Sequence, residues 1–149
     1  MDVIVCNGGD GAAQANRIYI NNGGLQGGTI GTFTDATAAR FAGVTVDTSR
    51  DIEFVDIDAD GDLDIYVANR GEPVVGQGEA SRFYGNLGGA QAGTIGFYQE
   101  QPDAQGGALV AVPGGDQILG GNAGPFRDWS CDCDFADLDG NTLGLFGWL

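Results

Sequence analysis

The chain has 149 residues, enough for one domain or a few small repeats, and its formal net charge is −15, from 21 acidic and 6 basic side chains. This charge argues against partners such as nucleic acid and anionic membrane surfaces, and it suits cation binding. The sequence has no histidine, the commonest general base, so we do not expect an enzyme. Its 28 glycines and the lack of a helical period predict an all-β fold.

The N-terminal part of the chain reads as short strands separated by glycine-rich turns. Residues 1–7 lack the basic start and the apolar run of a secretory signal, and no segment could span a bilayer, so we expect no membrane insertion. Runs of β-forming residues predict strands at residues 3–5, 17–20 and 32–34. We expect a mature chain, a fragment of a longer one, or the product of an incompletely known gene.

The most distinctive stretch is residues 56–64, where five aspartates alternate with other residues around one glycine. Five carboxylates this close would repel one another strongly without a counter-charge. Oxygen ligands at positions 1, 3, 5, 7 and 9 of a loop, with glycine at position 6, are typical of a loop that surrounds Ca²⁺. The predicted ligands are Asp56, Asp58, Asp60, Asp62 through its backbone carbonyl, and Asp64 through its side chain or a bridging water. We expect Leu63 to point inward and anchor the loop to a core.

Strand-like segments flank this loop. Residues 52–55 lead into it and residues 65–68 leave it, which predicts a hairpin with the calcium loop at its tip. Residues 82–84 and 94–98 predict a third and a fourth strand. Four short antiparallel strands in about 60 residues are typical of a propeller blade.

An EF-hand or dockerin loop is an alternative interpretation of the same aspartates. It requires an acidic residue at position 12, where this chain has Val67, and helices on both sides. The run that contains Val67 is strand-like, so we disfavour this alternative.

Two internal repeats support the blade interpretation. Residues 17–31 and 82–96 are identical at ten of fifteen positions, and residues 47–59 and 128–140 at six of thirteen. The second pair of segments is separated by a longer stretch of chain than the first pair, which indicates an insertion near 101–124. We therefore predict one repeat domain with a partial first repeat (1–46), a central repeat with the complete loop (47–127) and a partial third repeat (128–149).

The repeats also place an arginine at equivalent positions, Arg17 and Arg82. Each lies at the start of a predicted strand. We expect each to form a structural ion pair with a loop carboxylate.

Both ends of the chain carry parts of the same motif. The run DVIVCN at residues 2–7 resembles DIYVAN at residues 64–69, which places Asp2 at the last ligand position of a loop. Near the other end a loop begins but lacks its later acidic ligands. We predict a partial or composite calcium site from Asp137, Asp139, Asn141 and Asp2.

The segments FVDIDADGDLDIYVAN, SRFYGN and NRIYINNGG…GTFTDAT resemble FG-GAP/VCBS repeats, the calcium-binding blades of integrin-type β-propellers. The resemblance covers nearly the whole chain and is weakest over residues 101–124. It implies four-stranded antiparallel blades in a partial β-propeller or β-repeat array, with Ca²⁺ in the central loop. It also implies an extracellular or cell-surface location and a role in adhesion or assembly.

These features lead to one expected function and one alternative. We expect an extracellular calcium-binding structural or adhesive protein that self-associates head to tail in a fibre or surface layer, with glycans or surface proteins as further partners. A disulfide between subunits, from Cys6 to Cys131 or Cys133, is part of this hypothesis. The alternative is a fragment of a larger propeller with ligand-binding or enzymatic activity.

Overall fold

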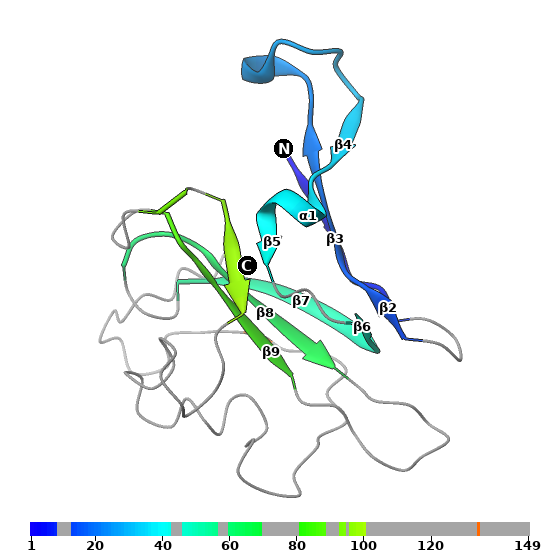
Figure 1. The fold of residues 1–149 in the computed structure, drawn as a ribbon, viewed down its shortest axis with the longest axis vertical. Helices are drawn as coiled ribbons and strands as arrows, with labels where there is room; N and C mark the ends of the chain where they lie inside the picture. Colours follow the sequence, from blue (N-terminus) through cyan, green and yellow to red (C-terminus); the bar gives the residue numbers. More distant parts are fainter. Residues whose placement is uncertain are drawn as a thin grey trace, which may run out of the picture.

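The computed structural model describes residues 1–8, 13–42, 46–56, 60–69, 81–88, 93–94, 96–100 and 134. Nearly all regular structure in these residues is β-strand, which confirms the all-β prediction (Figure 1). The strands are β1 (Val3–Val5), β2 (Gln14–Ala15), β3 (Arg17–Asn21), β4 (Phe33–Asp35), β5 (Phe41–Ala42), β6 (Val46–Asp47), β7 (Ser49–Val55), β8 (Asp64–Asn69), β9 (Arg82–Asn86) and β10 (Tyr98–Glu100). Two short helices, the 3₁₀ turn η1 (Gly24–Gln26) and the single turn α1 (Thr37–Arg40), complete the elements.

The strands form three sheets. The largest has the order β5-β10-β9-β8-β7, a second has the order β1-β3-β4, and β2 pairs with β6. Strands β7 to β10 form the predicted four-stranded antiparallel unit. The sequence did not predict its fifth strand: β5 comes from the chain before the unit and pairs with β10 in parallel, with Phe41 opposite Tyr98. Figure 1 shows β5 beside β10, next to α1.

The predicted fourth strand, residues 94–98, is a strand only at Tyr98 among its described residues. Gly96 has a φ of 70°, in the left-handed region that favours glycine. The N–H of Phe97 donates to the carbonyl of Thr94 at 3.0 Å, which closes the turn. Strand β10 therefore begins only at Tyr98 and runs to Glu100.

The sequence repeat is also a repeat in three dimensions. In the first copy, the N–H of Asn22 donates to the carbonyl of Thr32 at 2.9 Å, and in the second copy Leu87 donates to Phe97 at the same distance. A glycine packs against the same backbone in both copies. A Cβ added to Gly28 would lie 2.7 Å from the carbonyl oxygen of Asn22, and one on Gly93 would lie 2.2 Å from that of Leu87, and such contacts exclude a side chain.

The two larger sheets share one hydrophobic core. Its buried members are Ile18 from the N-terminal sheet and Phe41, Ile65, Val67 and Tyr84 from the central sheet. The ring of Phe41 meets Tyr84 edge to face, with 4.3 Å between ring centroids. The first repeat and the central repeat are therefore packed together and share the apolar area that stabilises both.

Both repeated arginines form ion pairs, but their partners are strand carboxylates and not the loop carboxylates that we expected. Arg17 pairs with Asp35 at 2.8 Å, and Arg82 pairs with Glu100, which is the equivalent position in the second copy. Arg82 also contacts Asp47, at 2.5 and 3.1 Å. Burial alone would lower the pKa of Arg82, but the hydrogen bonds and charges of these two carboxylates outweigh it and raise the pKa.

No helix among the described residues is long and apolar enough to cross a membrane.

Candidate metal centre

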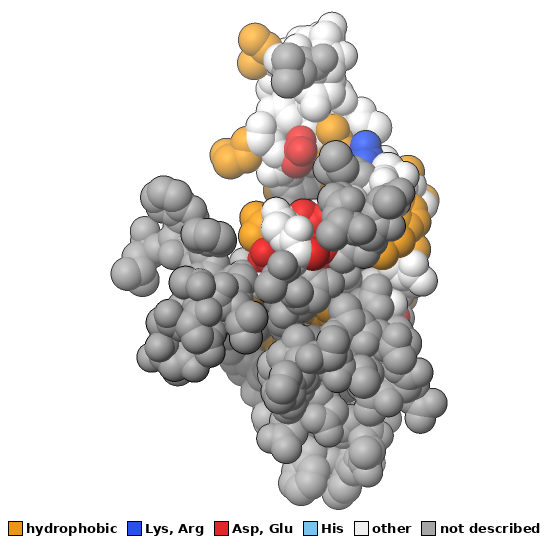
Figure 2. Space-filling view, turned by 90° about the vertical axis from the view of Figure 1, so that its left-hand side faces the viewer, with side chains coloured by type: hydrophobic (Ala, Val, Ile, Leu, Met, Phe, Trp, Pro, Cys, Tyr) orange, Lys and Arg blue, Asp and Glu red, His pale blue; other side chains and the backbone are white. Residues whose placement is uncertain are grey.

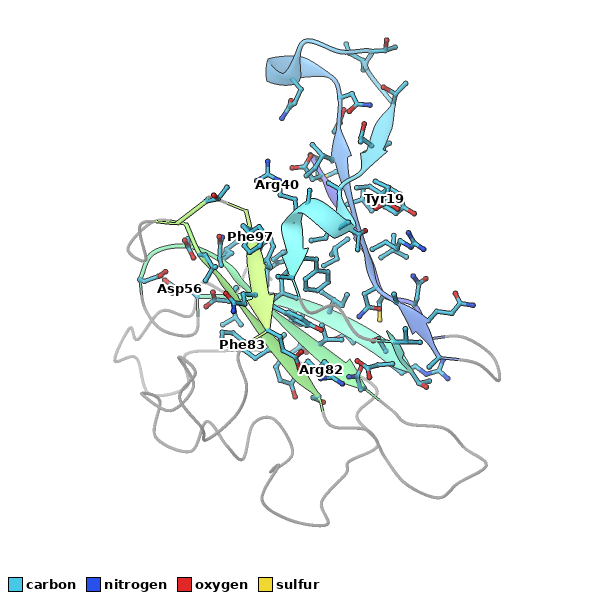
Figure 3. The ribbon with its side chains drawn as sticks, viewed as in Figure 1. Tyr19, Arg40, Asp56, Arg82, Phe83 and Phe97 are labelled. Carbon is cyan, nitrogen blue, oxygen red and sulfur yellow. The ribbon has the colours of Figure 1, made fainter. Side chains whose placement is uncertain are left out.

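The aspartate-rich loop connects two paired strands. Strand β7 ends at Val55, which is paired with Asp64 at the start of β8, and Phe54 is paired with Ile65. The hairpin predicted around the loop is therefore present, and Figure 3 shows Asp56 where the chain leaves β7. Since strands and not helices flank the loop, the EF-hand interpretation is wrong.

The first aspartate shapes the loop. Asp56 is buried, and its two carboxylate oxygens accept the N–H groups of Asp60 at 3.1 Å and Gly61 at 3.0 Å. Gly61 has a φ of 95°, which a residue with a side chain would adopt only under strain. Asp56 and Gly61 together therefore bend the chain back so that later positions of the loop return toward the first.

Asp60 and Asp62 lie in the returning half of the loop. The N–H of Asp62 donates to Oδ1 of Asp60 at 3.0 Å. The carboxylate oxygens of Asp62 and Oδ2 of Asp60 are buried, and no described residue hydrogen-bonds to Oδ2 of Asp60. A buried carboxylate oxygen without a partner is unfavourable, and a hard cation would satisfy it, so the donor set fits Ca²⁺.

Asp64 ends the loop at the base of the hairpin. It is fully buried, and its Oδ1 accepts the backbone N–H of Asn86 on β9 at 2.8 Å. The side-chain amide of Asn86 donates to the carbonyl of Leu63 at 3.1 Å. The prediction that Leu63 anchors the loop through its side chain is wrong, because the residue is 45% exposed. Its backbone carbonyl makes the anchoring contact instead.

The structure describes four of the five predicted ligands of this loop, and Asp58 lies outside the described residues. Among those four and the other described residues, no three acidic or cysteine side chains form a group arranged to hold a metal ion. The described aspartates of the loop therefore do not by themselves form a metal-binding group, and the role of Asp58 stays a prediction.

The predicted composite site is described only at Asp2. Its Oδ1 accepts the N–H of Asn21 at 2.9 Å, in the same way that Asp64 accepts from Asn86 in the next repeat. This bond supports the equivalence of Asp2 and Asp64. The other members of that site, Asp137, Asp139 and Asn141, lie outside the described residues, as do the predicted insertion near 101–124 and most of the predicted third repeat.

Charged side chains of both repeats act on the hydroxyl of Tyr98. Burial raises the pKa of its hydroxyl, the carboxylates of Asp62, Asp64 and Asp2 raise it further, and Arg40 lowers it. Asp2 of the first repeat and the end of the central loop therefore act on one side chain of β10. Figure 3 labels Arg40, the last residue of α1.

Cys6, which follows β1, is a free and half-buried thiol. Burial and, to a smaller extent, the charge of Asp51 raise its pKa to about 11, although Arg50 acts in the opposite direction. Because the thiolate is the reactive form, this environment opposes disulfide exchange at neutral pH. Cys131 and Cys133, the other members of the predicted disulfide, lie outside the described residues.

The surface combines acidic and apolar side chains. On the face drawn in Figure 2, acidic side chains lie between hydrophobic ones in the described part of the molecule. The exposed hydrophobic residues include Ile30 at 86%, Val46 at 62% and Phe33 at 46%. Single exposed apolar residues are common on protein surfaces, so they do not by themselves define a binding site.

Comparison with known proteins gives one family. The family model described as an FG-GAP-like repeat matches residues 1–67. The matched span includes the first repeat, strand β7, the aspartate-rich loop and most of β8. No curated protein and no solved structure matches the chain.

Proposed function

Since residues 1–67 place this chain in the FG-GAP-like repeat family, we propose that it is an extracellular calcium-binding β-repeat protein with a structural or adhesive role. FG-GAP repeats are typical of extracellular proteins, and they suggest a β-propeller-type fragment. Calcium is an element of the fold in this proposal, not a catalyst.

The observation that carries the proposal is the buried Oδ2 of Asp60, which has no hydrogen-bond partner among the described residues of this aspartate-rich hairpin loop. Asp56, Asp60 and Asp62 are held by hydrogen bonds within the loop, and Asp64 is held from β9. Bound Ca²⁺ would neutralise these carboxylates and would be coordinated by their oxygens together with those of Asp58. Such a site stabilises the connection between β7 and β8.

Calorimetric titration of calcium-free protein with CaCl₂ tests this proposal directly. We expect one main binding site. Asp60→Ala should weaken its affinity at least tenfold, which corresponds to about 1.4 kcal/mol. Asp35→Ala is the matched control, because Asp35 is an exposed aspartate of the first repeat outside the loop, and it should leave the affinity unchanged. Equal affinities for Asp60→Ala and the wild-type protein would overturn the assignment.

We also propose that the protein self-associates head to tail. Strand β1 lies at the edge of its sheet, and among the described residues its strand partner is β3 alone. An exposed sheet edge can accept a strand from another copy. The equivalent position in the central sheet is filled by β7, which pairs with β8, so a β7-like segment is the occupant that this edge fits.

Sedimentation and electron microscopy in calcium test the association. We expect oligomers or filaments in calcium and smaller species in chelator, because the net charge of −15 opposes association until cations bind. A monodisperse monomer at all calcium concentrations would contradict self-association but would leave calcium binding as proposed.

A further inference from the structure

Asn86 is the residue that connects the aspartate-rich loop to the rest of the central sheet. It is 5% exposed and ends strand β9. Its backbone N–H donates to Asp64, and its side-chain nitrogen donates to the carbonyl of Leu63. The chain leaves the loop through these two residues.

The same side chain also holds the turn that follows β9. Its Oδ1 accepts the N–H groups of Gly88 at 3.2 Å and Gly96 at 3.1 Å. Gly88 and Gly96 lie at the two ends of the connection between β9 and β10. One planar amide therefore fixes the end of the loop through its nitrogen and both ends of the turn through its oxygen.

Asparagine suits this position because its side chain carries both donor and acceptor groups. An aspartate would keep the two bonds to the glycine amides and lose the donor to Leu63. An alanine would lose all three side-chain bonds and leave polar backbone groups without partners in a buried place.

The equivalent residue of the first repeat, Asn21, provides an internal comparison. Its backbone N–H donates to Asp2 and its Oδ1 accepts the N–H of Gly23 at 2.9 Å, as in the central repeat. Among the described residues, that is the only hydrogen bond of the Asn21 side chain. The contacts to a loop carbonyl and to the far end of the turn distinguish Asn86.

We propose that Asn86 is a positioning residue that couples occupancy of the loop by calcium to the order of the turn between β9 and β10. This inference rests on the calcium-binding function proposed above. An ion held by the loop fixes Asp64 and the backbone at Leu63, and both are bonded to Asn86. The constraint reaches Gly88 and Gly96 through the Asn86 amide. Because coupling free energies are reciprocal, an ordered turn also raises the affinity of the loop for calcium.

Residue-resolved amide hydrogen exchange on the wild-type protein, with and without calcium, tests the coupling. We expect calcium to slow exchange at Gly88 and Gly96 and to leave Gly23, the equivalent amide of Gly88, unchanged. In Asn86→Ala this calcium dependence should be lost, and the calcium affinity should fall by about tenfold, the usual loss when a residue that orients a metal ligand is removed.

Two further variants separate coupling from a general loss of structure. Asn86→Asp retains the acceptor for both glycine amides, so it should keep the fold and still bind calcium more weakly than the wild-type protein. Asn21→Ala, the matched change in the first repeat, should leave the affinity unchanged. If Asn86→Ala does not fold, the exchange data on the wild-type protein and the calcium affinity of Asn86→Asp still test the coupling.

The outcomes distinguish the two proposals. Absence of calcium binding by the wild-type protein would overturn the calcium function and this coupling together. Calcium binding with unchanged exchange at Gly88 and Gly96, or with wild-type affinity in Asn86→Asp, would overturn the coupling alone.

Discussion

Removal of calcium should lower the midpoint of thermal unfolding by about 8 °C. An ion present at about 100 times its dissociation constant stabilises the folded state by about 2.7 kcal/mol, and a chain of about 150 residues loses roughly 2–4 °C per kcal/mol. The physical reason lies in the loop, where Asp56 and Asp64 are buried and Oδ2 of Asp60 has no hydrogen-bond partner among the described residues. Without the ion, the carboxylates must tolerate their mutual repulsion.

Thermal unfolding followed by circular dichroism in calcium and in chelator measures this effect. Asp58→Ala should unfold in calcium at nearly the temperature of the wild-type protein in chelator, and chelator should change it little further. Asp35→Ala, outside the loop, should respond to chelator as the wild-type protein does. If wild-type unfolding in calcium coincided with that in chelator, calcium would not be an element of this fold.

Arg82→Met should destabilise the protein by about 2–3 kcal/mol, whereas the equivalent change Arg17→Met should cost less than about 1 kcal/mol. Arg82 is bonded to Asp47 and Glu100, and these side chains are 11% and 28% exposed. The Arg17 pair is 49% and 40% exposed, so solvent screens it strongly. Methionine keeps the length and the apolar packing of the side chain, so the difference between the variants reports the charge.

Urea denaturation of the two variants gives the comparison. A larger loss of stability for Arg82→Met, with an unchanged dependence of the unfolding free energy on urea, would show that the two partly buried carboxylates depend on this guanidinium. Arg82→Lys should be more stable than Arg82→Met but less stable than the wild-type protein, because an ammonium lacks the planar guanidinium that reaches two carboxylates. Equal losses at Arg17 and Arg82 would contradict the burial argument.

The parts of the fold that sequence predicted are those with local signals. The hairpin around residues 56–64 follows from strand-forming runs on both sides of a glycine turn, and β7 and β8 are present. The first repeat follows from its similarity to residues 82–96, and the hydrogen bonds of its turn recur in the second copy. In both cases neighbouring residues determine the structure, so pattern and geometry agree.

The parts that sequence did not predict depend on contacts between distant residues. Strand β5 has two residues and exists because β10, far along the chain, lies beside it. The left-handed conformation of Gly96 forms a turn, so β10 begins later than the strand-forming residues around Gly96 predict. Propensity alone favours a longer strand there, and a left-handed glycine overrides it.

The candidate site divides in the same way. The spacing of the aspartates predicted a loop that Asp56 and Gly61 do bend as required. The anchoring residue Asn86 was missed, because its bonds to the loop cross from another strand. The available signal was that Asn21 and Asn86 occupy the same position in the two copies of the repeat. Leu63 was assigned the role that Asn86 performs.

The pairing of β5 with β10 has a consequence for the order of folding. Phe41 lies opposite Tyr98, so the pair joins residues far apart in the sequence, while β7, β8, β9 and β10 pair between neighbours. Closing a long chain loop costs more conformational entropy than forming a hairpin, so it is slower. During synthesis, β5 and the core residue Phe41 must wait until Tyr98 and the rest of β10 have emerged. We therefore expect the first repeat to finish folding only when the central repeat is present, and the two to unfold as one cooperative unit.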